Sequence, residues 1–512
     1  MEFRPSRLLG TLPLLLSLAL GCFAAIPPVR ANQVLFETFL GTAGLLGGWW
    51  AALTVWMAVQ HREPAFAVAL LKQHYLQACV HTSILLYWGW YVRTVYAEAY
   101  LILAQLVFAY AFDMLLQLSR RGRYTLGFGP FPIIFSTNLF LWFVDDRFYF
   151  QFALIAVGFA AKELLHWQRG GRSVHIFNPS SFPLAIASWL LLFTHSFGIT
   201  SGEQIAGSQF RPPHIYLFIF LVALPGQYLF GVTTMTLAAV VTMYAWGAAQ
   251  LAITGMTFSY QAYIPIAVFL AMNLLFTDPS TSPRSELARI LFGIAYAGTV
   301  ILLEATLRPS FPSKLLLVPA LNLAVPLFER AGQSRALRWI DPSRLAPQLT
   351  GRRRNLAYMA LWAAVFGVML SLRGLGDRFP AQEIPFWRQA CHVRGQKACE
   401  RMVTAEQVDC KRGSGWACNE FGYAQQWLRD YQGAQESFSE ACRLGFSKGC
   451  ENAPRVGQGG KADRGVPSPA DYPILMSTFK WFRRDRLSAL PETQLLAEAC
   501  STGWTEACGG PR

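Results

Sequence analysis

Between two strongly apolar segments the chain reads GRSVHIFNPSSF, from Gly171 to Phe182, and this polar stretch decides how the rest of the sequence is interpreted. Pro179 suits the first turn of a helix, and Asn178 is a natural helix cap. The other interpretation is a ligand site, because the start of a helix offers free N–H groups and a partial positive charge to a phosphate or an electron-rich ring edge. Both interpretations place a turn at a membrane surface, followed by a transmembrane helix.

The composition indicates a protein that lies mostly in a membrane. Of its 512 residues, 53% are hydrophobic and 14% are charged, whereas soluble domains carry about 25% charged residues. Apolar segments of about 20 residues, each long enough to cross a membrane as a helix, recur along the chain. We therefore predict an all-α fold, a polytopic membrane bundle of about 13 transmembrane helices. The predicted spans are residues 8–28, 35–59, 76–97, 98–118, 130–145, 148–166, 182–197, 214–229, 231–254, 259–276, 288–306, 314–328 and 355–372.

The net charge of +14 is distributed over alternate loops, which argues against a nucleic-acid-binding surface. Basic residues gather at 120–123, 162–172, 284–289 and, most densely, 330–354. Basic loops remain in the cytoplasm during insertion. This rule predicts a multi-pass protein of the bacterial cytoplasmic membrane, in contact with membrane lipid, with its N-terminus in the cytoplasm and its C-terminus in the periplasm. Basic residues before the first span would also suit a signal peptide, but we expect an uncleaved helix.

The segment 373–512 is mostly polar and holds eight of the ten cysteines, in four pairs with the same spacing of eight. Positions eight apart on one helix are about 12 Å from each other, too far for a disulfide. Each pair must therefore span a tight bend, and a glycine lies inside every pair. Zinc sites favour shorter cysteine spacings. Eight cysteines permit many pairings, but four sequential bridges are the simplest: Cys391–Cys399, Cys410–Cys418, Cys442–Cys450 and Cys500–Cys508.

This tail also resembles a known repeat family. Residues 417–450, ACNEFGYAQQWLRDYQGAQESFSEACRLGFSKGC, read as a helix, a turn at Gly433, a helix and a second turn. They resemble the Sel1-like, cysteine-rich relatives of tetratricopeptide repeats, in which a disulfide ties each helix pair to the next. The resemblance implies an α-helical solenoid whose concave face binds a periplasmic protein. Disulfides need an oxidising compartment, and the charge rule independently places the tail in the periplasm.

A second polar stretch lies at the end of another apolar segment, in AMNLLFTDPSTSPRSELARILFG, from Ala271 to Gly293. The tripeptide TDP at 277–279 ends the span, and a new helix is expected from about Pro283. A carboxylate at a membrane boundary is costly to desolvate and needs a partner. Counting the crossings places both polar stretches on the cytoplasmic side, so we predict that they form one site.

Three short motifs occur in the order found in a known family: HIFNPSSF at 175–182, TDPSTSPRSELARILFG at 277–293 and LNLAVPLFER at 321–330. Over about residues 125–330 the chain resembles the integral-membrane flavoprotein superfamily of the B subunit of the Na⁺-translocating NADH:quinone reductase and the D subunit of the Rnf complex. Within this superfamily, the sequence resembles most the subgroup labelled with enediyne biosynthesis. The predicted domains are N-terminal transmembrane helices (1–124), a flavoprotein-like core (125–330), a basic cytoplasmic loop with the last transmembrane helix (331–372) and a periplasmic repeat domain (373–512).

The resemblance implies a flavin, either riboflavin or FMN, bound non-covalently near the cytoplasmic face, with electrons passed to or from a quinone or a redox partner protein. The residues that would border this flavin are Asn178, Pro179, Thr277 and Asp278, with Lys162, Arg289 and Asn322 as supporting polar residues. The family's covalent FMN is attached to a threonine in a long extracytoplasmic insertion. This chain has only the short segment 194–213 there, without an equivalent motif, so covalent FMN is not expected.

Other features of the sequence carry less weight. His74 and His81 lie seven apart on one helix face and could ligate a haem, but two solvated or hydrogen-bonded histidines are the favoured interpretation. The sequence has no P-loop and no G-x-G-x-x-G, H-E-x-x-H or C-x-x-C motif, so we expect neither NADH oxidation nor a metal site. The alternative function is a transporter or membrane assembly scaffold that binds no flavin and whose periplasmic repeats bind a partner protein.

Overall fold

The computed structural model describes residues 2–169, 171–259, 261–306, 317–345, 348–349, 351–477 and 481–509. The described chain is mostly helical, as the hydropathy pattern predicts. It divides into two compact units. The first comprises Met1–Gln209, Tyr216–Met243 and Ile266–Val365, and the second comprises Phe210–Ile215, Tyr244–Pro265 and Phe366–Arg512. The boundary between the units therefore falls within two long helices, near residues 243 and 365.

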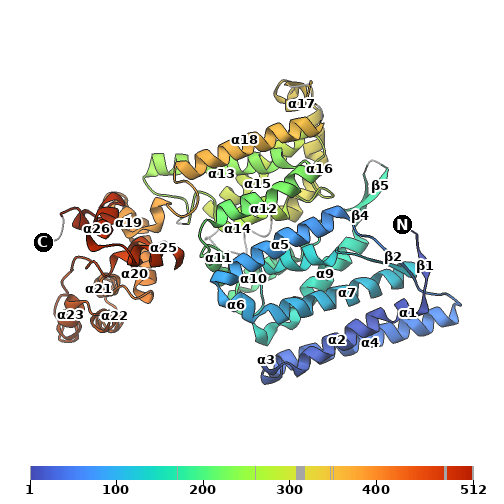
Figure 1. The fold of residues 1–512 in the computed structure, drawn as a ribbon, viewed down its shortest axis with the longest axis horizontal. Helices are drawn as coiled ribbons and strands as arrows, with labels where there is room; N and C mark the ends of the chain where they lie inside the picture. The colour runs from blue at the N-terminus through green and yellow to red at the C-terminus, as the bar shows by residue number, and fades with distance from the viewer. Residues whose placement is uncertain are drawn as a thin grey trace. The chain divides into compact units, whose positions relative to one another are not determined.

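Long apolar helices dominate the first unit. Long and short together, the helices that lie wholly or partly in this unit are, in chain order, α1 (Arg7–Gly10), α2 (Leu12–Cys22), α3 (Pro27–Ala31), α4 (Gln33–Val59), α5 (Lys72–Tyr91), α6 (Arg93–Ala97), α7 (Ala99–Arg121), α8 (Pro130–Asn138), α9 (Tyr149–Leu164), α10 (Ser181–Thr194), α11 (Gly202–Gln209), α12 (Ile215–Phe230), α13 (Thr233–Thr254), α14 (Ile266–Leu270), α15 (Glu286–Thr306), α16 (Leu317–Gln333), α17 (Pro342–Leu345) and α18 (Gly351–Ser371). Helices α2, α4 and α7 pack against one another (Figure 1) and bury an aromatic cluster around Phe39, Phe108 and Phe152.

Six helices of the described ranges are long and apolar enough to cross a membrane: Arg7–Ala25, Gln33–Val59, Ala99–Arg121, Thr233–Thr254, Glu286–Thr306 and Gly351–Ser371. Several other predicted spans form shorter helices, including α10 and α12. The predicted span 130–145 yields only the nine-residue α8. Asn138 ends that helix, and its buried amide bonds with that of Gln105. The total of thirteen crossings stays a prediction.

Two small sheets depart from the all-α prediction. Strand β1 (Arg4–Pro5) pairs antiparallel with β2 (Ala65–Val68), which pairs parallel with β3 (Arg123–Leu126). Strand β4 (His166–Arg169) pairs antiparallel with β5 (Arg172–His175). These strands have two to four residues, too few to produce a readable alternation of apolar and polar side chains. The β4–β5 pair occupies the predicted basic loop after α9 and leads directly into the stretch that opens α10.

The second unit contains α19 (Ile384–Arg394), α20 (Gln396–Lys411), α21 (Gly415–Trp427), α22 (Tyr431–Arg443), α23 (Ser447–Gly457), α24 (Tyr472–Met476), α25 (Trp481–Ser488) and α26 (Glu492–Ser501). Consecutive helices from α19 to α23 pack side by side (Figure 1). Their core is aromatic: Trp416 lies edge-on to Trp504, and Tyr472 contacts the same ring.

The four sequential disulfides are confirmed: Cys391–Cys399, Cys410–Cys418, Cys442–Cys450 and Cys500–Cys508. Each closes a bend in which one glycine adopts a positive φ, namely Gly395, Gly413, Gly445 and Gly503. This left-handed backbone is open to glycine at no steric cost, which explains why every pair encloses one. The predicted turn at Gly433 is wrong. The chain turns at Leu428–Asp430 instead, and the Asp430 carboxylate caps α22 by accepting from the Gly433 N–H at 3.0 Å.

Candidate ligand site at the start of helix α10

Asn178 ties together the two polar stretches that the sequence singles out. Its Oδ1 accepts hydrogen bonds from the N–H groups of Ser180 and Ser181, at 2.9 and 3.0 Å. Its Nδ2 donates to the carbonyl of Leu275, at 3.1 Å, in the segment that precedes Asp278. The Asn178 side chain is buried, so each of these bonds is shielded from water. Asn178 therefore caps the turn that leads into α10, in which Ser180 is the residue directly before the helix, and it also bridges two segments that lie almost 100 residues apart in sequence.

The cap changes the predicted ligand chemistry of this helix start. The N–H groups of Ser180 and Ser181 bond to the Asn178 side chain, and the N–H of Phe182 bonds to the Asn178 carbonyl at 3.1 Å. The free N–H groups proposed for a phosphate or a ring edge are thus already paired. A ligand at this site must be held by side chains.

The Leu275 carbonyl is available to Asn178 because Leu275 is the last residue of a helical segment, where carbonyls lack a partner within the helix. After α14 the chain forms a π-helical segment, η4 (Ala271–Leu275), closed by a bond from the Phe276 N–H to the Ala271 carbonyl. Segments of this type occur frequently at functional sites. Close approach from the opposite side depends on Gly158 in α9, where a Cβ atom would lie only 2.6 Å from the Pro179 carbonyl oxygen.

Asp278 organises the turn that follows η4. Its carboxylate accepts from the Ser280 N–H at 3.0 Å and from the Thr281 hydroxyl at 3.2 Å, and it lies 3.4 Å from Nε2 of His175. Burial alone would raise the pKa of the Asp278 carboxyl, whereas the hydrogen bond and the charge of His175 lower it. With the Ser280 and Thr281 donors added, the pKa of Asp278 lies below its usual value, so this half-buried carboxyl is an anion at neutral pH.

Asn322 supports the site from α16. Its Oδ1 accepts from the backbone N–H of Asn178 at 3.2 Å, and its Nδ2 donates to the Thr281 carbonyl at 3.0 Å. Asn322 is fully buried. It therefore holds the start of α10 against the turn after Asp278, and its role as a supporting residue of a flavin site stays a prediction.

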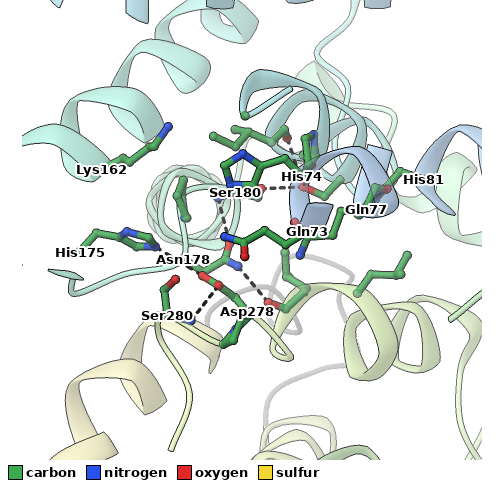
Figure 2. A pocket seen from close by; sticks show the side chains of 18 of the residues that line it. Gln73, His74, Gln77, His81, Lys162, His175, Asn178, Ser180, Asp278 and Ser280 are labelled. Carbon is green, nitrogen blue, oxygen red and sulfur yellow. Dashed lines mark hydrogen bonds and ion pairs between the residues drawn. The ribbon is translucent and has the colours of Figure 1, made fainter. Parts of the chain in front are cut away.

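These segments line a half-open cavity with a volume of about 100 Å³. Asn178, Pro179, Asp278 and Lys162, all predicted site residues, contribute to its wall, together with His175 and Ser280. Figure 2 shows the polar side chains of α5, among them Gln73, His74 and Gln77, at the same cavity. A smaller cavity adjoins it and shares Gln77, His81, Phe230 and Leu274 as lining residues.

Three of the predicted residues, Thr277, Arg289 and Asn322, lie outside this main cavity. Thr277 lines the smaller cavity, and its hydroxyl donates to the Asn273 carbonyl at 3.0 Å. Arg289 lines neither cavity: its guanidinium donates to the backbone carbonyls of Pro283 and Gly231. Arg289 thus connects the turn before α15 to the start of α13, and the structure assigns it no contact with a ligand in either cavity.

The contribution of α5 was missed by the sequence analysis. His74 and His81 both line the cavity wall, and His81 is buried and hydrogen-bonded to the Gln77 carbonyl, which is one of the two predicted alternatives. Their spacing of seven signals a common helix face, but nothing local indicates what that face contacts. Within the described ranges, no group of three or more His, Cys, Asp or Glu side chains could hold a metal ion.

Comparisons with known proteins do not assign this chain to a family. No family model, curated protein or solved structure matches this sequence or its fold.

Proposed function

We propose that this protein is a membrane electron-transfer subunit that binds a flavin non-covalently in the cavity at the start of α10. The observation that supports this most is the convergence of Asn178, Pro179, Asp278 and Lys162, which the flavoprotein resemblance singles out, on one cavity wall. The three motifs that carry the resemblance also meet there, because Asn322 of the third motif bonds to both of the others.

The chemistry of the cavity suits the polar edge of an isoalloxazine ring. That edge presents carbonyl oxygens and ring nitrogens as acceptors and one imide N–H as a donor. The ammonium group of Lys162 and the amide groups of Gln73 and Gln77 supply donors on the cavity wall. A bound flavin would supply one- and two-electron transfer, which none of these side chains can perform.

The volume of the cavity limits how a flavin would bind. Ordinary small-molecule sites measure about 300–1,000 Å³, and this cavity measures about 100 Å³. The ring would therefore enter by one edge, with the remainder in the open mouth. The small volume also favours the second candidate, a transporter or scaffold whose cavity admits only a small polar solute.

The proposed setting is a bacterial cytoplasmic membrane, with the cavity near the cytoplasmic face and the disulfide-bonded unit in the periplasm. Four disulfides support the oxidising compartment, and the basic loops support the orientation. Electrons would come from a partner protein and pass to or from a quinone. The helices of the second unit would form a solenoid that binds a periplasmic protein.

Riboflavin binding to the purified protein tests the proposal. Asp278→Ala removes an anionic acceptor and leaves the Ser280, Thr281 and His175 donors without it, at a cost of about 1–3 kcal/mol. Since about 1.4 kcal/mol is tenfold in affinity, riboflavin Kd should rise about ten- to a hundredfold. The matched control is Asp430→Ala, which removes a capping aspartate in the second unit and should leave Kd unchanged. A wild-type protein that binds no riboflavin, or an Asp278→Ala variant with the wild-type Kd, would refute the proposal.

A further inference from the structure

His81 presents an unpaired hydrogen-bond acceptor inside the protein. Its Nδ1 lies 2.6 Å from the backbone carbonyl of Gln77. A carbonyl can only accept, so Nδ1 carries the proton and Nε2 presents a lone pair. That Nε2 is buried and has no hydrogen-bond partner among the described residues. His81 lines both adjoining cavities.

Gln227 in α12 lines the smaller cavity and holds a second unpaired acceptor. Asn273 donates through Nδ2 to the Phe269 carbonyl at 2.9 Å, which leaves its Oδ1 as an acceptor. Gln227 must then donate through Nε2 to this oxygen, at 3.1 Å. The orientation of the Gln227 amide is thereby fixed, and its Oε1 is buried without a partner among the residues that the structure describes.

Two buried acceptors at one cavity require a donor. An unsatisfied buried polar group is costly, and the great majority of such groups in proteins are paired. A water molecule in the cavity can donate to such an acceptor. A ligand that displaces this water loses affinity unless it brings a donor of its own.

We propose that His81 and Gln227 give the site a preference. It favours ligands that insert a hydrogen-bond donor into the cavity over ligands that present only acceptors. This inference rests on the proposed role of the cavity as the ligand site, and it adds the orientation of the ligand. A flavin would enter with its imide N–H directed at His81. An oxidised quinone, whose polar groups are all carbonyl oxygens, would be rejected here, whereas its reduced quinol form carries donors.

The selection is measured with two pairs of probes on the purified full-length protein in detergent. One pair is riboflavin and 3-methylriboflavin, which lacks the imide N–H. The other is a short-chain ubiquinol and its oxidised ubiquinone. The wild type should bind the donor-bearing member about ten- to a hundredfold more tightly. In His81→Phe, which keeps a planar ring but has no acceptor, the ratio should fall below about threefold.

The variant also controls for the bulk of the added methyl group, because steric exclusion would persist in His81→Phe. Equal binding within both probe pairs by the wild type overturns the inference, and so does a preference that a folded His81→Phe retains. The wild-type ratios decide the matter if that variant does not fold. Should riboflavin fail to bind while ubiquinol is preferred in a His81-dependent manner, the proposed flavin function falls and the inference stands.

Discussion

Replacing Asn178 by alanine removes the side chain that joins the two halves of the candidate site. The Asn178 amide makes three buried hydrogen bonds, to the N–H groups of Ser180 and Ser181 and to the Leu275 carbonyl. At about 1 kcal/mol net for each bond, Asn178→Ala should lower the free energy of unfolding by about 3 kcal/mol. Riboflavin affinity should fall as well, because α10 and η4 are no longer held together.

A matched control exists at the start of α4. Asn32 also caps a helix, accepting from the Leu35 N–H at 3.1 Å, but its Nδ2 bond to Asp146 is exposed. Asn32→Ala should therefore cost only about 1 kcal/mol. The assay is thermal unfolding of both variants in detergent, followed by tryptophan fluorescence, with a riboflavin titration of each. Equal destabilisation by the two substitutions would refute the bridging role of Asn178.

Three further predictions concern other parts of the chain. The double replacement Cys442→Ser with Cys450→Ser removes one short-loop disulfide and should destabilise the second unit by about 2–3 kcal/mol, measured by denaturant unfolding; an unchanged midpoint would contradict the structural role of the bridge. Burial, and then the nearby charge of Glu420, raises the pKa of Glu406 to about 8 from 4.5. The folded state therefore binds the Glu406 proton more tightly than the unfolded state does. The stabilisation that this proton gives is complete below pH 4.5 and is lost as pH rises through 8. The second unit should accordingly unfold more readily at pH 9 than at pH 5, and Glu406→Gln should reduce that difference, whereas an unaltered pH profile would exclude Glu406 as its source. Arg289→Met breaks the bonds to two backbone carbonyls and should lower thermal stability while leaving riboflavin Kd within about threefold; a tenfold loss of affinity would place Arg289 in the site after all.

Features with a strictly local cause could be predicted from the sequence. The cysteine pairs are eight apart with a glycine between them, and steric rules alone require a bend there, which Gly395 and Gly445 form with positive φ. The cap at Asn178 follows equally from its place before an apolar helix. The meeting of the Asn178 and Asp278 stretches could be predicted because the predicted crossings put both stretches on the same membrane face.

Features that depend on long-range packing could not be predicted from the sequence. The polar face of α5 carries Gln73, His74 and Gln77, but only the tertiary fold brings it to the cavity. The parallel pairing of β2 with β3 joins four-residue strands more than 50 residues apart, and no local pattern indicates it. Gly433 looks like a turn residue, but Asp430 provides a better cap three residues earlier, and this capping bond moves the turn.

The central claim, that the cavity at the start of α10 holds a flavin, is tested most directly by the absorption spectrum of the protein purified from bacterial membranes in mild detergent. The spectrum should show the flavin bands. Acid precipitation should release the flavin into the supernatant, because no covalent attachment is expected, and Asp278→Ala protein prepared in parallel should carry much less of it. Absence of these bands, also after incubation with excess riboflavin, would contradict the claim. Equal flavin content in the Asp278→Ala protein would place the flavin elsewhere in the chain.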